Sequence, residues 1–149
     1  MRKVKDSSNQ AEYWLIEENS GHAAHSYVTA SCFDGNDAII TARMRRQDDF
    51  LCSYVRTDLR TGEEKTIFEG GRWPGYLVWN HKLYQFLENR LLETDISTGK
   101  TAELFRGEYK LDEIPSITKD GRFLSLSWRN EDRSTSACLL EKETGKCEE

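Results

Sequence analysis

The C-terminal part of the chain reads Ile114-Pro-Ser-Ile-Thr-Lys-Asp-Gly-Arg-Phe-Leu-Ser-Leu-Ser-Trp128 and, after a polar break at 129–134, Thr135-Ser-Ala-Cys-Leu-Leu-Glu-Lys-Glu-Thr-Gly-Lys146. Asp120-Gly121 is a tight-turn dipeptide, because glycine reaches positive φ without steric cost. Apolar residues then largely alternate up to Trp128, which is the period of a strand. A second apolar run ends at Thr144-Gly145, another turn signal. This stretch predicts strand, turn, strand, loop, strand and turn.

The last turn of this stretch is repeated earlier in the chain. Asp58-Leu-Arg-Thr-Gly62 matches Asp95-Ile-Ser-Thr-Gly99 and, more loosely, Glu141-Lys-Glu-Thr-Gly145. A period near 40 residues with four short strands in each cycle is typical of propeller blades. One such sheet cannot cover its own apolar faces, whereas stacked blades cover one another. Earlier strands are expected at 11–17, 26–33, 38–42, 50–59, 66–68, 75–79, 82–87, 90–96 and 101–105.

The sequence therefore predicts an all-β fold, a partial β-propeller of about three four-stranded antiparallel blades. The blades are expected at roughly 26–70, 71–107 and 112–149, in a single domain over 11–149 that follows a disordered tail over 1–10. A β-sandwich is the alternative, but it does not predict the matched Asp-x-x-Thr-Gly turns. Closed propellers usually have four to eight blades. We therefore expect a fragment, or an array whose exposed edges favour self-association.

The composition is that of a globular protein, with 32% charged and 37% apolar residues. No apolar run approaches the roughly 20 residues of a membrane span, and no hydrophobic stretch follows the basic N-terminus, so neither a membrane nor a secretory signal is predicted. The net charge of -5 gives no support to nucleic-acid binding. Cys32, Cys52, Cys138 and Cys147 form no C-x-x-C pair, which favours reduced, partly buried thiols in a cytosolic protein.

The stretch 13–145 resembles the N-terminal part of the oligogalacturonate lyase family of propellers. His25-Ser-Tyr-Val-Thr-Ala-Ser-Cys-Phe33 with Asp34-Gly35 is similar to the family's first blade, Leu83–Gly99 to its second and 114–149 to its third. The resemblance implies cytoplasmic proteins that cleave unsaturated pectin oligomers by β-elimination. It also implies that the family's manganese site of histidines and a glutamine lies in a C-terminal half with no counterpart here, so no cofactor is expected in this chain.

Histidines and arginines are the candidate ligand-binding residues. His22 and His25 could contribute to a metal site, but such a site needs three or four ligands and the spacing identifies no third, so no metal is predicted. Guanidinium groups suit the carboxylates of uronic acids because they offer paired donors. If equivalent loops share one rim, an acidic-sugar patch would form; its candidate members are Arg43, Arg45, Arg129, Arg133 and, with them, His25. The alternative is a solvated loop neutralised by nearby acidic residues.

Other residues carry weaker signals. Trp73 and Tyr76 open the second blade and could stack on sugars, although burial between blades is favoured; Trp14, Trp79 and Trp128 are expected in the core. His81, in a turn, is expected to be exposed. No Ser-His-Asp order, P-loop or dinucleotide fingerprint occurs. Two functional hypotheses remain: a portion of a lyase-like propeller that acts on or binds unsaturated pectin oligosaccharides and is inactive alone, or a non-catalytic propeller module that binds protein or carbohydrate.

Overall fold

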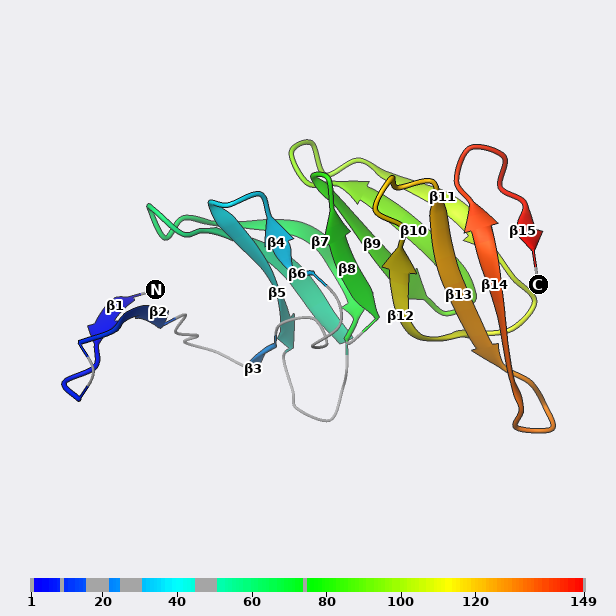
Figure 1. Cartoon of the computed structure of the whole chain (residues 1–149), viewed down its shortest axis with the longest axis horizontal. Helices are drawn as coiled ribbons and strands as arrows, with labels where there is room; N and C mark the ends of the chain where they lie inside the picture. Colours follow the sequence, from blue (N-terminus) through cyan, green and yellow to red (C-terminus); the bar gives the residue numbers. More distant parts are fainter. Residues whose placement is uncertain are drawn as a thin grey trace.

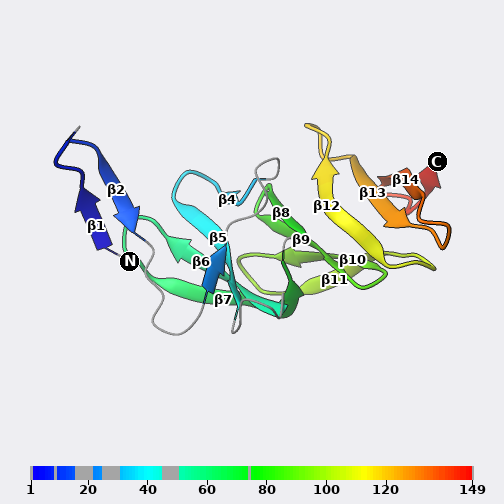
Figure 2. The ribbon, with the colours of Figure 1, turned by 90° about the horizontal axis from the view of Figure 1, so that it is seen from below.

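The computed structural model describes residues 2–8, 10–15, 22–24, 31–44, 51–73 and 75–148. These residues form antiparallel β-sheets and no helix. Three of the sheets follow one another along the long axis (Figure 1), and the view from below shows the same row (Figure 2). The predicted all-β, partial propeller is confirmed, and the two-layer sandwich is not.

The first sheet contains β3 (His22–Ala24), β4 (Phe33–Asp34), β5 (Ala38–Met44), β6 (Leu51–Asp58) and β7 (Glu64–Arg72). The order β3-β5-β6-β7 makes β7 one edge, and β4 pairs with the start of β5. The strand expected at 26–33 lies mostly outside the described residues; only its end, Phe33, is seen in a strand. β7 is longer than the three residues predicted, because it continues past two irregularities in its register with β6.

The second and third sheets are simple meanders. The second contains β8 (Tyr76–Trp79), β9 (Lys82–Leu87), β10 (Arg90–Asp95) and β11 (Thr101–Arg106), and the third contains β12 (Leu111–Ile117), β13 (Phe123–Arg129), β14 (Thr135–Glu141) and β15 (Cys147–Glu148). Consecutive strands pair in each, as the turn spacing predicted. β15 was not readable from the sequence, because two polar or small residues carry no strand period.

The N-terminal residues require a correction. β1 (Arg2–Lys5) pairs with β2 (Glu12–Leu15), where the sequence predicted a disordered tail over 1–10. The connecting turn is closed by backbone hydrogen bonds from Asp6 to Ala11 and from Gln10 to Asp6, and the Asp6 carboxylate accepts the Ser8 amide at 2.7 Å. The polar composition of β1 hid the strand, because its order comes from pairing with β2. The hairpin stands at the N-terminal end of the row of sheets (Figure 1).

The repeated Asp-x-x-Thr-Gly segments form the same turn three times, between the last two strands of each sheet. Gly62, Gly99 and Gly145 have φ of 77°, 72° and 68°, a region that glycine enters at little cost. Their amides donate to the carbonyls of Asp58, Asp95 and Glu141 at 2.8, 2.7 and 2.8 Å. The predicted structural equivalence of the three segments is therefore confirmed.

These turns predict acid sensitivity. Lys82, then Ser97 and the Thr98 amide, donate hydrogen bonds to the Asp95 carboxylate and lower its pKa, and amides of the turn lower the pKa of Asp58. A carboxyl with a lower pKa in the folded chain stabilises it fully above the unfolded value of about 3.9, and this stabilisation is lost as the pH falls below that value. We expect the urea midpoint to drop between pH 5 and pH 3. Asp95→Asn should lower the midpoint at pH 5 and reduce this drop, and the control Glu108→Gln should behave as the parent; a pH-independent midpoint would contradict the assignment.

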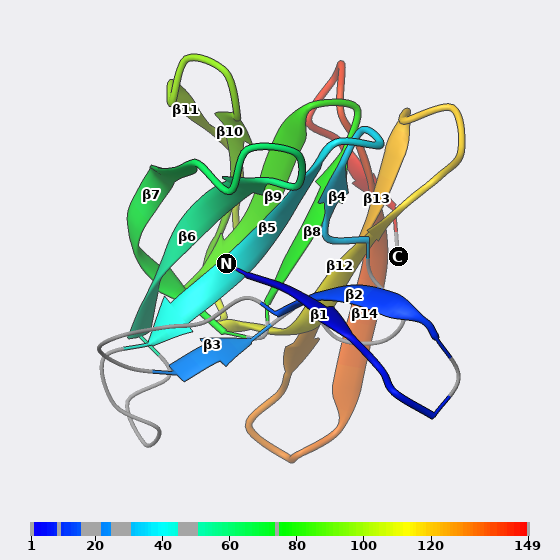
Figure 3. The same ribbon diagram turned by 90° about the vertical axis from the view of Figure 1, so that its left-hand side faces the viewer.

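Two apolar layers lie between the three sheets. Ile40, Tyr54, Tyr76 and Leu83 are fully buried between the first and second sheets. The opposite face of the second sheet packs on the third through a second cluster: Leu77, Tyr84, Phe86, Leu91, Leu111, Leu124, Leu126, Cys138 and Leu140. Successive residues of a strand face opposite sides, so the second sheet is buried on both faces over β8, β9 and β10. Figure 3, along the row, shows the sheets stacked one behind another.

The outer face of the third sheet carries small polar side chains along the middle of β13. Ser125 and Ser127 alternate with the buried Leu124 and Leu126, and Ser125 exchanges a hydrogen bond with Ser116 at 2.7 Å. Leu139 is the large apolar side chain exposed there, at 52%. Self-association through exposed strand edges remains a prediction.

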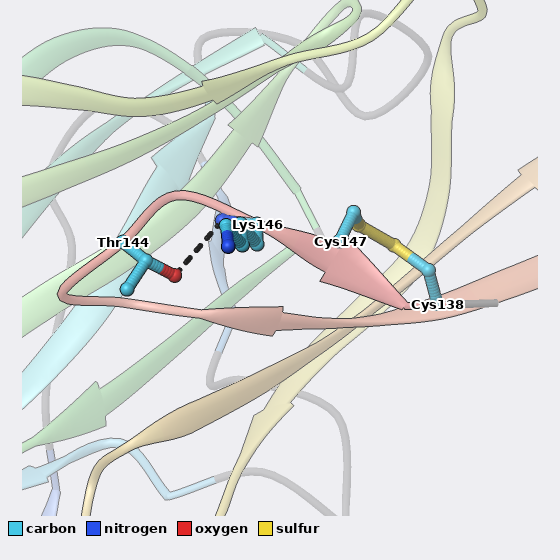
Figure 4. Close-up of a disulfide and its surroundings, with 4 residues drawn as sticks. All are labelled: Cys138, Thr144, Lys146 and Cys147. Atoms are coloured by element: carbon cyan, nitrogen blue, oxygen red, sulfur yellow. Dashed lines mark hydrogen bonds between the residues drawn. A yellow bond between two sulfur atoms is a disulfide. The ribbon is translucent and has the colours of Figure 1, made fainter.

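The cysteines also differ from expectation. Cys138 of β14 and Cys147 of β15 form a disulfide (Figure 4), whereas Cys32 and Cys52 are free and buried. The expectation of four reduced thiols is therefore wrong for one pair. Spacing could not show this pairing, because the nine-residue separation becomes a Cα distance of 5.8 Å only when β15 folds back on β14.

No helix in the described part of the chain is long and apolar enough to cross a membrane.

Candidate functional site

A buried carboxylate lies where the first and second sheets meet. Asp34 ends β4, and its side chain is only 5% exposed. One carboxylate oxygen accepts a hydrogen bond from Arg56 Nε of β6 at 2.9 Å, and the other lies 2.6 Å from His81 Nδ1. A buried charge is tolerated when it is paired and hydrogen-bonded. Asp34 therefore fixes both basic side chains.

His81 is placed by the turn between β8 and β9. Asn80 and His81 have φ of 46° and 59°, as a two-residue hairpin turn of type I′ requires. The imidazole is 70% exposed. Since a carboxylate accepts, the contact assigns the proton to Nδ1 and leaves Nε2 for a ligand.

These residues line a cavity of about 620 Å³, which we name the Asp34 cavity. Its walls come from both sheets: Asp34, Gly35, Asn36, Asp37, Arg56, Lys65, His81, Ile96 and Ser97. Lys65 Nζ donates to the Ser97 carbonyl at 2.7 Å and so joins β7 to the second sheet. The turns at 35–37, 80–81 and 96–97 lie at the upper edge in Figure 1.

The cavity offers cations and a proton acceptor. Arg56 and Lys65 are positive, and the Asp34 carboxylate is used by Arg56 and His81. The Asp37 carboxylate, which also lines the cavity, pairs with Arg60. Ser97 shares the cavity, but its hydroxyl donates to Asp95 at 2.6 Å. A Ser-His-Asp relay needs the serine bonded to the histidine, so these residues do not form one. The arrangement suits an anionic ligand.

The arginines predicted from the sequence are not assembled at this cavity. Arg43, on β5, pairs with Glu64 at 2.5 Å and is 10% exposed. Arg129 ends β13, and Arg133 follows in the next turn with φ of 70°. β5 and β13 both end at the lower edge in Figure 1, opposite the Asp34 cavity, but they belong to the first and third sheets and the second lies between them. Arg45 and His25 lie outside the described residues.

Most of the aromatic residues that the sequence placed in the core lie in or against the two apolar layers between the sheets. Tyr76 is fully buried and donates its hydroxyl to the Ile40 carbonyl at 3.1 Å. Trp73 packs on the first apolar cluster, and Trp79 and Trp128 pack on the second. Burial between sheets, not sugar stacking, therefore accounts for Tyr76.

Lys142 makes a second polar link, between the second and third sheets. Its ammonium lies 2.6 Å from the Tyr84 hydroxyl and 3.0 Å from Glu93, and 4.8 Å from the Tyr84 ring centroid. Burial, and then the hydrogen bond to Glu93, raise the pKa of Tyr84. These groups satisfy one another, so we interpret them as a structural clamp.

A manganese ion, as the resembled family binds, does not fit the described residues. No three histidine, cysteine, aspartate or glutamate side chains converge among them. In the Asp34 cavity both carboxylate oxygens of Asp34 already face basic groups.

Comparison with known proteins shows similarity to solved structures and not to any family model or curated protein. No family model matches the sequence, and no curated protein does either. Among solved structures, an oligogalacturonate lyase in complex with manganese is similar with a TM-score of 0.78 and 15% identity, over 99% of this chain and 45% of the lyase. An auxiliary nutrient binding protein from Bacteroides thetaiotaomicron is similar with a TM-score of 0.50 and 13% identity, over 74% of this chain and 28% of that protein. This chain thus spans less than half the length of the lyase. At these identities the likeness shows a shared propeller-like fold.

Proposed function

We propose that this chain is an acidic-oligosaccharide-binding module of a lyase-like propeller, that the Asp34 cavity is its site, and that it does not turn the sugar over alone. One observation carries the proposal: Arg56, Lys65 and His81 reach one cavity from three different segments. The likeness in fold to an oligogalacturonate lyase supports a uronic acid as the ligand.

The geometry leaves donors for a carboxylate. Arg56 uses Nε for Asp34, and this bond leaves its two terminal nitrogens, which suit paired carboxylate oxygens. Lys65 gives one of its three donors to the Ser97 carbonyl. His81 presents Nε2 at an exposed position, where its lone pair can accept a hydrogen bond from a sugar hydroxyl. A sugar carboxylate held by Arg56 and Lys65 would exchange hydration for charge-assisted hydrogen bonds.

The binding experiment is a calorimetric titration with unsaturated digalacturonate at low salt, with a neutral galactose disaccharide as the control ligand. Lys65→Gln is expected to weaken binding about tenfold, because a hydrogen bond to a charged group contributes about 1.5–3 kcal/mol. Lys100→Gln, at an exposed turn position outside the cavity, is the matched control and should bind as the parent does. Binding should weaken as salt is added.

The rival site is tested by the same titration. If Arg129→Gln with Arg133→Gln abolishes binding and Lys65→Gln does not, the ligand binds the arginine loop of the third sheet. Equal affinity for the neutral disaccharide, or no binding at low salt, would remove the proposal. Turnover is followed separately as loss of the unsaturated-uronate absorbance with manganese supplied, and no loss is expected.

A further inference from the structure

The disulfide forms part of the wall of a second cavity. This cavity, of about 310 Å³, lies between the second and third sheets and is lined by the rings of Phe105, Tyr109 and Trp128 and by both disulfide cysteines. Cys138 is buried at 5% exposure, whereas Cys147 is exposed. A reagent in solvent therefore approaches the disulfide from the side of Cys147.

The disulfide joins β15 to β14. β15 comprises two described residues, and it pairs with β14 at Leu139↔Glu148 and Leu140↔Cys147. The turn before β15 is held separately. The Glu141 amide donates to the Lys146 carbonyl at 2.8 Å, and the Lys146 amide donates to Thr144 Oγ1 at 3.2 Å (Figure 4). Beyond the turn, the described contacts between β15 and β14 are this pairing and the disulfide.

We propose that Cys138–Cys147 is a thiol–disulfide exchange site, at which a dithiol reductant releases β15 from the edge of the third sheet. A thiolate of the reductant attacks Sγ of Cys147, the sulfur–sulfur bond breaks, and Cys138 leaves as a thiolate that takes up a proton. The second thiol of the reductant then attacks the mixed disulfide and releases Cys147. Two electrons pass to the protein, and the reductant ends as its own disulfide.

Release of β15 changes two surfaces together. The edge of β14 beside Leu139 and Leu140 loses its partner, and an unpaired edge is a template for pairing with another chain. The cavity loses the wall that Cys147 provides. The other two cysteines take no part: both are buried, and burial raises the pKa of Cys52 to about 11, so that its reactive thiolate form is scarce.

Amide hydrogen exchange of the full chain, with and without dithiothreitol, tests this proposal. Reduction is expected to speed exchange over 139–148 at least tenfold and to leave Leu124 and Leu126 of β13 unchanged; reoxidation should restore the slow rate. Cys138→Ser with Cys147→Ser should exchange rapidly at 139–148 whether or not the reductant is present. Cys32→Ser with Cys52→Ser should keep the full response.

Three outcomes would overturn the proposal. Alkylation of the native, unreduced chain followed by mass measurement could show four free thiols, in which case there is no disulfide to exchange. Complete reduction could leave amide hydrogen exchange at 139–148 unchanged, which would show that β15 stays paired with β14 without the disulfide. Reduction could also speed exchange equally in all three sheets, which would make the disulfide a general stabiliser and not a local release.

Discussion

Leu124→Ala is expected to lower the free energy of unfolding by about 2–5 kcal/mol, because truncating a buried leucine loses apolar burial and leaves a cavity. Leu124 is fully buried in the apolar layer between the second and third sheets. For a chain of this size, such a loss lowers the melting temperature by about 4–20 °C. Urea unfolding followed by circular dichroism and tryptophan fluorescence measures it and shows whether the three sheets unfold together.

The same sheet supplies the control. Leu139→Ala makes the same chemical change on the outer face, where Leu139 is 52% exposed. Surface substitutions usually change stability by at most about 0.5 kcal/mol. Equal losses from the two variants would mean that the third sheet does not pack on the second through the Leu124 face.

Gly121→Ala is the second large effect, with an expected loss of about 2–5 kcal/mol from backbone strain and overpacking together. Gly121 has φ of 74°, and a Cβ there would run into the indole ring of Trp79 on the second sheet. Two costs therefore combine: a left-handed backbone that alanine disfavours, and a displaced ring in the apolar layer. Trp79 should also report the change through a shifted fluorescence emission.

Gly145→Ala separates these two costs. Gly145 has φ of 68°, but a Cβ there meets nothing within 4 Å. Only the backbone strain should remain, so the loss is expected at about 1–2 kcal/mol with unchanged tryptophan emission. If Gly121→Ala is no worse than Gly145→Ala, the turn at 120–121 does not press against Trp79.

The strands and turns were largely readable because their signals are local. An Asp-x-x-Thr-Gly turn requires a glycine at positive φ and a carboxylate that accepts the following amides, and both requirements lie within five residues. Alternation from Phe123 to Trp128 gave β13 in the same way. β1 and β15 carry no such signal, since each is ordered by the strand beside it.

The candidate site was harder to predict from the sequence than the strands and turns were. His81 was expected to be exposed, and it is, but its contact with Asp34 joins residues 47 positions apart. A signal was present: the turn is Asn80-His81, where the equivalent turns are Asp34-Gly35 and Asp120-Gly121. A bulky residue in a turn that requires positive φ points to a side chain held by something else.

The sequence by itself determined the repeat, the all-β class and the alternation that divides each strand between two faces, because turn geometry and strand period depend on neighbouring residues. Only the tertiary structure decided which faces meet and which rims align. It placed Asp34, Arg56 and His81 around one cavity, left Arg43 and Arg129 on separate sheets, and brought Cys138 against Cys147. These contacts depend on how whole sheets stack and how β15 folds back, and no local pattern of residues encodes that.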